Sequence, residues 1–335
     1  MTMTSIGDLA QHMMLRSRSA QLSRTMMQLT SELASGQVAD VNRHLDGDIA
    51  PLLDIDRDLT RLSGFDLAIS EAGTRAQAMQ HSLSQVQSTG ETLSITLIDV
   101  AAGRLQAPQA AVAAQASAAL ETMVAALNTD VAGRGLFSGT ASDRAALAPA
   151  ETLLSSLKAA LPSHASAQEI RDAAQVWFDD PAGFAAQIYT GSDQSRSATR
   201  IGDGDQVALD LRADDPAFRA VMMETALAAL STDADLALTD TNRRSLLRGA
   251  GEQLVTANDQ MIARQAELGQ AQSRIEAAAT RNAATRTSLD MTRTTMLEAD
   301  PYDTALKLEE AQYQLESLYT VTARNARISL LSYLE

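Results

Sequence analysis

The chain has 335 residues, a net charge of −15 and no cysteine, and aromatic residues make up only 3% of it. The acidic balance argues against a general nucleic-acid binder, because phosphate contacts need clustered cations. The absence of cysteine excludes disulfides, thiolate metal sites and a cysteine nucleophile. The length suggests about two domains, whose cores must be built mainly from aliphatic side chains.

Neither a membrane span nor a secretory signal is predicted. The sequence contains no run of about 18 apolar residues, the minimum for a spanning helix. Residues 1–15 lack a basic segment followed by a continuous apolar one. We therefore expect no membrane partner, and export, if it occurs, by a route without a cleaved signal peptide.

The first third reads as three helices. Residues 5–34 carry apolar residues at steps of three and four, which places them on one helix face. This helix should end at Gly36, which can adopt a left-handed conformation. A second helix is predicted from Pro51 to near Gly103 and a third over residues 108–130, before a glycine-rich segment at 133–139.

The middle of the sequence has shorter elements. Short helices are predicted over 153–161 and 167–178, and most of the aromatic residues lie near them. Alternating apolar residues over 199–211, with a Gly-Asp-Gly-Asp turn at 202–205, predict a β-hairpin. A further helix should begin near Pro216.

The last third is again helical, over residues 242–299 and 302–334, with Pro301 between the two helices. A seven-residue apolar repeat indicates a coiled-coil seam against another helix. It comprises Leu247, Leu254, Met261, Leu268, Ile275, Leu289 and Met296.

These elements predict a mainly α fold. The N- and C-terminal segments should form a long antiparallel helical coiled-coil bundle, with a small α+β tip domain inserted in the middle. We expect terminal core helices at 1–40 and 301–335, a helical bundle at 41–140 and 245–300, and an outward-facing insertion domain at 141–244.

Candidate chemical motifs have plain structural interpretations. Asp54 and Asp58 share a helix face with nearby arginines, which is typical of a solvated surface. The 202–205 segment lacks the later ligands of a calcium loop. Gly249-Ala250-Gly251-Glu252 is not a phosphate loop, because no Lys-Ser/Thr follows it.

No histidine has a partner at metal-ligand spacing, and no nucleophile elbow is found. We therefore predict that the protein is not an enzyme and needs no cofactor or metal. A Ser-His-Asp triad assembled only in the fold stays open as an alternative.

Several motifs at the two ends resemble those of the bacterial flagellin superfamily. They are the Leu33-Ala34-Ser35-Gly36 turn and the Asp-rich segment 46–51, then Ala266-Glu267-Leu268-Gly269, Gln272–Ile275, the Asp300-Pro301 joint and the closing Ser329–Leu334. The resemblance covers residues 1–140 and 245–335. The 46–51 segment departs from the sequence that flagellins usually have there.

Within the superfamily, two further motifs resemble the hook–filament junction type (hook-associated protein 3, or FlgL type). These are Gly133-Arg134-Gly135-Leu136-Phe137-Ser138-Gly139 and Tyr189-Thr190-Gly191, the latter followed by an arginine-containing strand. Flagellins usually lack both motifs.

The resemblance implies a structural protein of the bacterial flagellum, exported by the type III apparatus and located outside the cell at the hook–filament junction. It also implies self-association into a ring-like layer and contacts with hook-associated protein 1, flagellin and an export chaperone. Apolar seams on terminal helices need partners, which neighbouring subunits can supply. The residues expected at this assembly interface are Leu9, Met13, Leu22, Met26, Leu29, Leu33, Leu308, Leu315, Leu318, Val321, Ile328 and Leu331.

Two other interpretations stay open. The chain could be flagellin itself, which would form long filaments alone. It could also be a soluble coiled-coil signalling protein, whose assembly would not depend on both termini.

Overall fold

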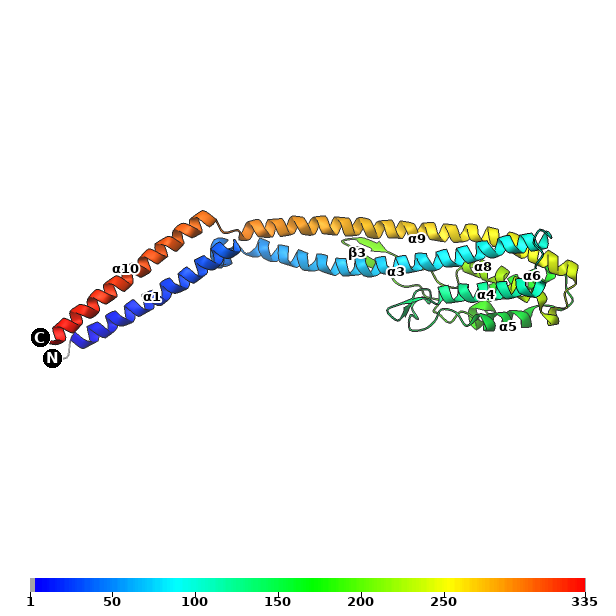
Figure 1. Ribbon diagram of the computed structural model, residues 1–335, viewed down its shortest axis with the longest axis horizontal. Coiled ribbons are helices and arrows are strands. Elements are labelled where there is room, and N and C mark those ends of the chain that lie inside the picture. Colours follow the sequence, from blue (N-terminus) through cyan, green and yellow to red (C-terminus); the bar gives the residue numbers. More distant parts are fainter. Residues whose placement is uncertain (1–3, 335) are drawn as a thin grey trace. The chain divides into compact units, whose positions relative to one another are not determined.

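A computed structural model describes residues 4–334 of the chain, and the side chains of residues 10–324 within them. The fold is mainly α, as predicted, with long helices and only short strands in the middle of the chain (Figure 1). The long helices are α1 (Thr4–Ser35), α3 (Ala50–Ala101), α9 (Asp240–Leu297) and α10 (Pro301–Leu334).

The chain divides into two compact units. Unit 1 comprises residues 1–62 and 283–335, and unit 2 comprises residues 63–282. Unit 1 contains α1, α10, the short α2 (Val41–His44), the start of α3 and the end of α9. The three-part division expected from the sequence stays a prediction.

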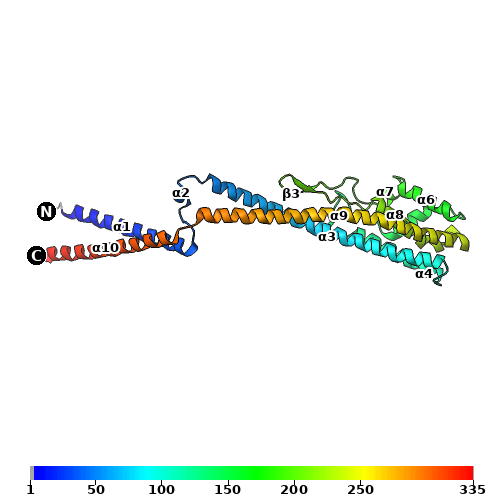
Figure 2. The same cartoon turned by 90° about the horizontal axis from the view of Figure 1, so that it is seen from above.

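In unit 2, α3 and α9 run antiparallel, side by side (Figures 1 and 2). Gly73 faces Ile275, Gly90 faces Asn258, and Ile98 faces Gly251. The two residue numbers in each facing pair have nearly the same sum, so the register stays constant along the seam. The predicted seven-residue repeat is confirmed from Leu247 to Ile275, where all five members are buried, whereas Leu289 and Met296 are only half-buried.

A polar residue continues this repeat. Asn282 stands seven residues after Ile275 and is buried, and its side-chain amide donates a hydrogen bond to the carboxylate of Asp66 on α3. A polar pair at a seam position favours one register over its neighbours, because a slip would leave both groups without each other.

The insertion packs on this helix pair. Its helices are α4 (Gln109–Leu127), α5 (Ala150–Ala160), α6 (Ala167–Asp179), α7 (Phe184–Gln187) and α8 (Pro216–Ala229). Short 3-10 turns at Leu230–Thr232 and Ala234–Leu236 lead into α9. The buried faces of α4 and α8 join those of α3 and α9 in one hydrophobic core.

Although aromatic residues make up only 3% of the chain, several of them pack together in the core of the insertion. The ring of Trp177 lies 5.1 Å from that of Phe178, and Phe178 stacks on Phe184 with centroids 5.0 Å apart. Phe137 meets Phe218 edge-on at 5.8 Å. The core of unit 2 is therefore aliphatic between the long helices and aromatic at the insertion.

The predicted hairpin is present as β3 (Thr199–Gly202) and β4 (Asp205–Val207), which pair antiparallel with Thr199 opposite Val207. The second strand is shorter than expected. Arg274 and Arg281 of α9 form ion pairs with Asp205, and the guanidinium of Arg200 lies 5.7 Å from the ring centroid of Phe65. These contacts tie the hairpin to both long helices of unit 2.

A second, minimal hairpin pairs β1 (Asp130–Val131) with β2 (Arg134–Gly135). It follows α4, which is the one helix of the described chain that is long and apolar enough to cross a membrane. Its apolar residues, including Leu120, Met123 and Leu127, are buried in the core of unit 2. This burial favours its interpretation as a core helix.

Candidate assembly surface

The two terminal helices pair within the chain. In unit 1, α1 and α10 lie side by side and antiparallel (Figures 1 and 2). Leu22 and Leu29 of α1 are 8% exposed, and Ala311 of α10 is 5% exposed. These residues form a seam, which we call the α1–α10 seam, and it is narrow because few of the apolar residues on the two helices are fully buried.

The structure brings together about half of the residues expected at the assembly interface. Leu22 and Leu29 are buried in the α1–α10 seam, and Met26, Leu308, Leu315 and Leu318 are half-buried along it. Met13, Leu33 and Val321 are 66%, 42% and 46% exposed. The side chains of Leu9, Ile328 and Leu331 lie outside the described residues. Their part in contacts between subunits stays a prediction.

A short joint connects this pair to the rest of unit 1. Gly36 ends α1 with a φ of 69°, as its position after the helix predicts. The following residues form a bridge with the segment after α9: the amide of Val38 donates to the carbonyl of Leu297 at 3.0 Å, and that of Ala299 donates to Gly36 at 3.0 Å. The segment that follows α1 and the segment that follows α9 are therefore hydrogen-bonded to each other at this joint.

The start of α10 is built from the Asp300-Pro301 pair that the sequence singled out. The carboxylate of Asp300 accepts hydrogen bonds from the amides of Tyr302 and Asp303, at 2.8 and 3.1 Å. Pro301 occupies the first helical turn, where no amide donor is needed. The joint is thus a capped helix start.

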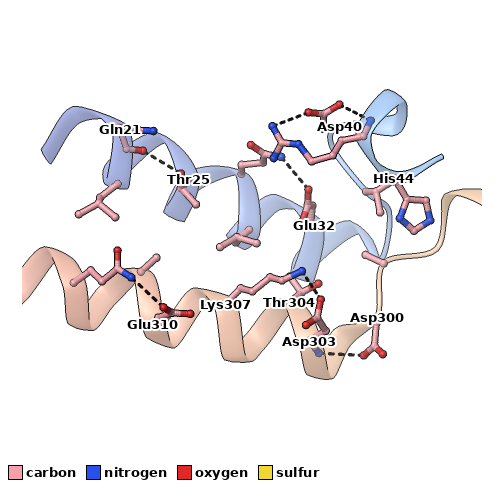
Figure 3. Close-up of a pocket in the computed structure, with 18 of the residues that line it drawn as sticks. Gln21, Thr25, Glu32, Asp40, His44, Asp300, Asp303, Thr304, Lys307 and Glu310 are labelled. Atoms are coloured by element: carbon pink, nitrogen blue, oxygen red, sulfur yellow. Dashed lines mark hydrogen bonds and ion pairs between the residues drawn. The ribbon is translucent and has the colours of Figure 1, made fainter. Parts of the chain in front are cut away.

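A groove of about 700 Å³ lies between α1, the joint and α10 (Figure 3). Leu22, Leu29 and Ala311 line it together with charged residues of both signs. The ammonium of Lys307 pairs with Asp303, and this hydrogen bond raises the pKa of the exposed lysine. Glu32 accepts hydrogen bonds from the amide of Ala39 at 2.9 Å and from Gln28 at 3.1 Å. The groove therefore combines apolar side chains with hydrogen-bonded charged groups, a mixture that is suited to packing against protein.

Three tyrosines of α10, which the sequence analysis did not single out, are exposed. Tyr302, Tyr313 and Tyr319 are 75%, 74% and 57% exposed. Four of the five tyrosines of the chain lie in its last 34 residues, and that concentration was a signal available from the sequence. Exposed tyrosine is typical of protein interfaces, because its ring combines apolar area with a polar end.

The glycine-rich 133–139 segment has a structural role in unit 2. Its end packs against the segment around Gly191: the amide of Ser192 donates to the carbonyl of Ser138, and the amide of Thr140 donates to Gln194, both at 3.0 Å. The two motifs that resemble the junction type are therefore in direct contact. Burial raises the pKa of Tyr189, whose hydroxyl donates to the carbonyl of Ser192, to about 12.

The glycines of the Gly249-Ala250-Gly251 segment permit close packing in α9. A side chain at Gly251 would meet Ile98 of α3, and one at Gly249 would meet the guanidinium of Arg171. Arg171 in turn makes a two-pronged ion pair with the buried Glu224 of α8, with N–O distances of 3.3 and 3.2 Å. This pair lies between α6, α8 and α9.

The Glu224 carboxyl predicts a pH dependence of stability. Burial raises its pKa to about 7, although Arg171 opposes the shift. Folded protein therefore binds more protons than unfolded protein between about pH 4.5 and 7, so this group's contribution is complete below that range and is lost as pH rises through it. We expect a loss on the order of 3 kcal/mol, measured as the difference in unfolding free energy between wild type and Glu224→Gln across pH 5–8. Glu151→Gln, which removes an exposed carboxylate, is the control variant.

The described part of the chain contains no group of three or more acidic or histidine side chains that could hold a metal. His12, His44, His81 and His164 are each exposed, on separate segments. Asp54 and Asp58 pair with Arg57 and Arg61 at 2.8 and 3.2 Å, as their spacing predicted.

Comparison with known proteins adds the family context. Residues 252–334 match the bacterial flagellin C-terminal helical region. No curated protein sequence matches the chain significantly. The matched region comprises most of α9 and all of α10, so it includes one side of the α1–α10 seam.

Two solved structures share the fold of this flagellin-like chain. One is described as a flagellar hook-associated protein of Vibrio parahaemolyticus, with 13% identity and a TM-score of 0.50, covering 72% of this chain and 94% of that one. The other is Bacillus cereus FlgL, with 13% identity and a TM-score of 0.51, covering 72% and 98%. The flagellin region and this fold together support a structural role in the bacterial flagellum, the role expected from the sequence.

Proposed function

We propose that this chain is a structural component of the hook–filament junction of the bacterial flagellum. In this role it joins the hook-side junction protein, hook-associated protein 1, to the flagellin filament through packing of its terminal helices. The observation that carries the proposal is the pairing of α1 with α10 in a unit that also holds the flagellin-type C-terminal helix. The likeness of 72% of the chain to hook-associated proteins supports the junction over other flagellar positions.

The same proposal includes localisation and partners. The protein acts outside the cell after export through the flagellar type III apparatus, guided by an export chaperone. It associates with itself in a ring-like layer, and it needs no cofactor and catalyses no reaction. The narrow α1–α10 seam supports self-association, because it leaves much of both helices for contacts with neighbours.

Flagellin is the second candidate. The family match favours flagellin, because the matched region is described as that of flagellin. The two glycine motifs in contact with each other favour the junction type, because they are the features by which the sequence resembles that type.

Deleting the gene and imaging the cells separates the two. We expect hooks without filaments, with flagellin released into the medium, if the chain is the junction protein. Loss of filaments with no flagellin in the medium would instead identify the chain as the filament subunit. Normal filaments would contradict both candidates.

A further inference from the structure

The outward faces of α1 and α10 are complementary to each other. Met27 of α1 is 65% exposed and Tyr313 of α10 is 74% exposed. Each stands two residues from a buried seam residue, Leu29 and Ala311 respectively, and two residues rotate a side chain by about 200° around a helix. Both side chains therefore point away from the α1–α10 seam, on opposite sides of the helix pair.

The outward faces of α1 and α10 also differ in charge. Arg24 of α1 and Glu316 of α10 are exposed on these outward faces. Within the part of the chain whose side chains are described, neither has an ion-pair partner. Arg24 donates only to a carbonyl of its own helix, that of Ala20, at 3.3 Å. In a protein with a net charge of −15, an exposed basic group opposite an acidic one gives association a defined direction.

The outward residues of α1 also lie level with those of α10 along the helix pair. Glu32 of α1 and Lys307 of α10 both line the groove and interact electrostatically across it. Because the helices are antiparallel, a residue five positions before Glu32 lies level with the residue five positions after Lys307, and the same holds for eight positions. Met27 is thus level with Tyr313 to within a residue, and Arg24 is level with Glu316.

From these observations we propose that the outward face of α1 in one copy packs on the outward face of α10 in the next, with Met27 against Tyr313 and Arg24 against Glu316. Methionine sulfur against an aromatic ring is a favourable contact. The two faces differ and lie on opposite sides, so each copy binds one neighbour on each side. Such a head-to-tail contact builds a ring or a row, whereas two identical faces would stop at a dimer. The proposal rests on the proposed function and specifies which surfaces the copies share.

Charge reversal tests the contact in cells that lack the native gene. We expect Arg24→Glu alone and Glu316→Arg alone each to reduce incorporation into flagella at least tenfold, because each places like charges together. The double variant, which restores opposite charges, should recover incorporation. Arg244→Glu is the matched control and should incorporate normally, because Arg244 is an exposed arginine of α9 that, like Arg24, donates to the carbonyl four residues before it, at 3.2 Å. A double variant no better than the single ones would overturn the proposal.

Cross-linking provides an independent measurement, because the chain contains no cysteine of its own. A full-length protein with both Met27→Cys and Tyr313→Cys should give a ladder of dimers, trimers and higher species with a short bis-maleimide in isolated flagella. Each single cysteine variant should stay monomeric. Dimers from a single cysteine would show that identical faces meet, and no ladder would show that other surfaces are used.

The two tests also separate this proposal from the proposed function. If gene deletion leaves hooks without filaments but the reversal variants incorporate like wild type, the junction role stands and the face pairing is wrong. If deletion leaves normal filaments, the function is wrong, and cross-linking of the purified full-length protein at high concentration still tests the contact.

Discussion

Removal of α10 by deleting residues 301–335 is expected to abolish incorporation into the flagellum and leave unit 2 folded. The deletion removes one side of the α1–α10 seam, so Leu22 and Leu29 lose their cover. Each buried leucine stabilises its packed state by about 2 kcal/mol, and an isolated helix in water is marginal without such a partner. Unit 2 has its own core of α3, α4, α8 and α9 and includes no residue of α10.

The measurement combines three readings of the truncated protein. Electron microscopy with a specific antibody reports incorporation, the medium reports export, and Trp177 fluorescence reports unit 2. Trp177 is the only tryptophan and is 7% exposed, so its emission and unfolding midpoint should stay close to those of the full chain.

A point variant distinguishes loss of the seam from loss of an export signal. Leu22→Asp places a charge in the α1–α10 seam, while Ser17→Asp places the same charge at an exposed position of α1. We expect the first to be exported but not incorporated and the second to behave as wild type. Incorporation of either the truncated protein or Leu22→Asp at the native level would contradict the role of the seam.

The sequence predicted the helical part of this fold well, because helix signals are local. Apolar spacing gave the long helices to within a few residues, and the repeat from Leu247 to Ile275 correctly indicated a continuous seam. Gly36 and Pro301 marked the helix boundaries for stereochemical reasons that do not depend on the rest of the fold. The spacing of Asp54 and Asp58 also gave their arginine partners.

Contacts between distant segments could not be predicted in this way. Asp56 accepts a hydrogen bond from Arg293, 237 positions away, at 2.8 Å, and nothing near either residue indicates the other. The Arg171–Glu224 pair and the contact of Ser138 with Ser192 depend likewise on how separate elements pack. The assembly residues were chosen by spacing alone, so residues of the α1–α10 seam and exposed residues such as Met13 were grouped together.

Replacing Gly139 by alanine is expected to destabilise unit 2 by on the order of 4 kcal/mol. Gly139 has a φ of 62°, which costs a residue with a side chain about 1 kcal/mol. Its added Cβ would lie 2.6 Å from the carbonyl oxygens of Ser192 and Gln194. These oxygens belong to backbone and cannot rotate away. The carbonyl of Gln194 also accepts the Thr140 amide, so relief of the overlap would cost that hydrogen bond, worth about 1 kcal/mol.

Gly204 is the matched control, because it separates conformational strain from overlap. It has a φ of 73° in the β3–β4 turn, and a Cβ there would meet nothing within 4 Å. Gly204→Ala should therefore cost only about 1 kcal/mol. The free energies of unfolding would be measured by denaturant titration of the full chain with Trp177 fluorescence as the signal. Equal losses for the two variants would mean that the two glycine-containing segments do not pack as closely as described, and that the contact between the two junction-type motifs does not hold unit 2 together.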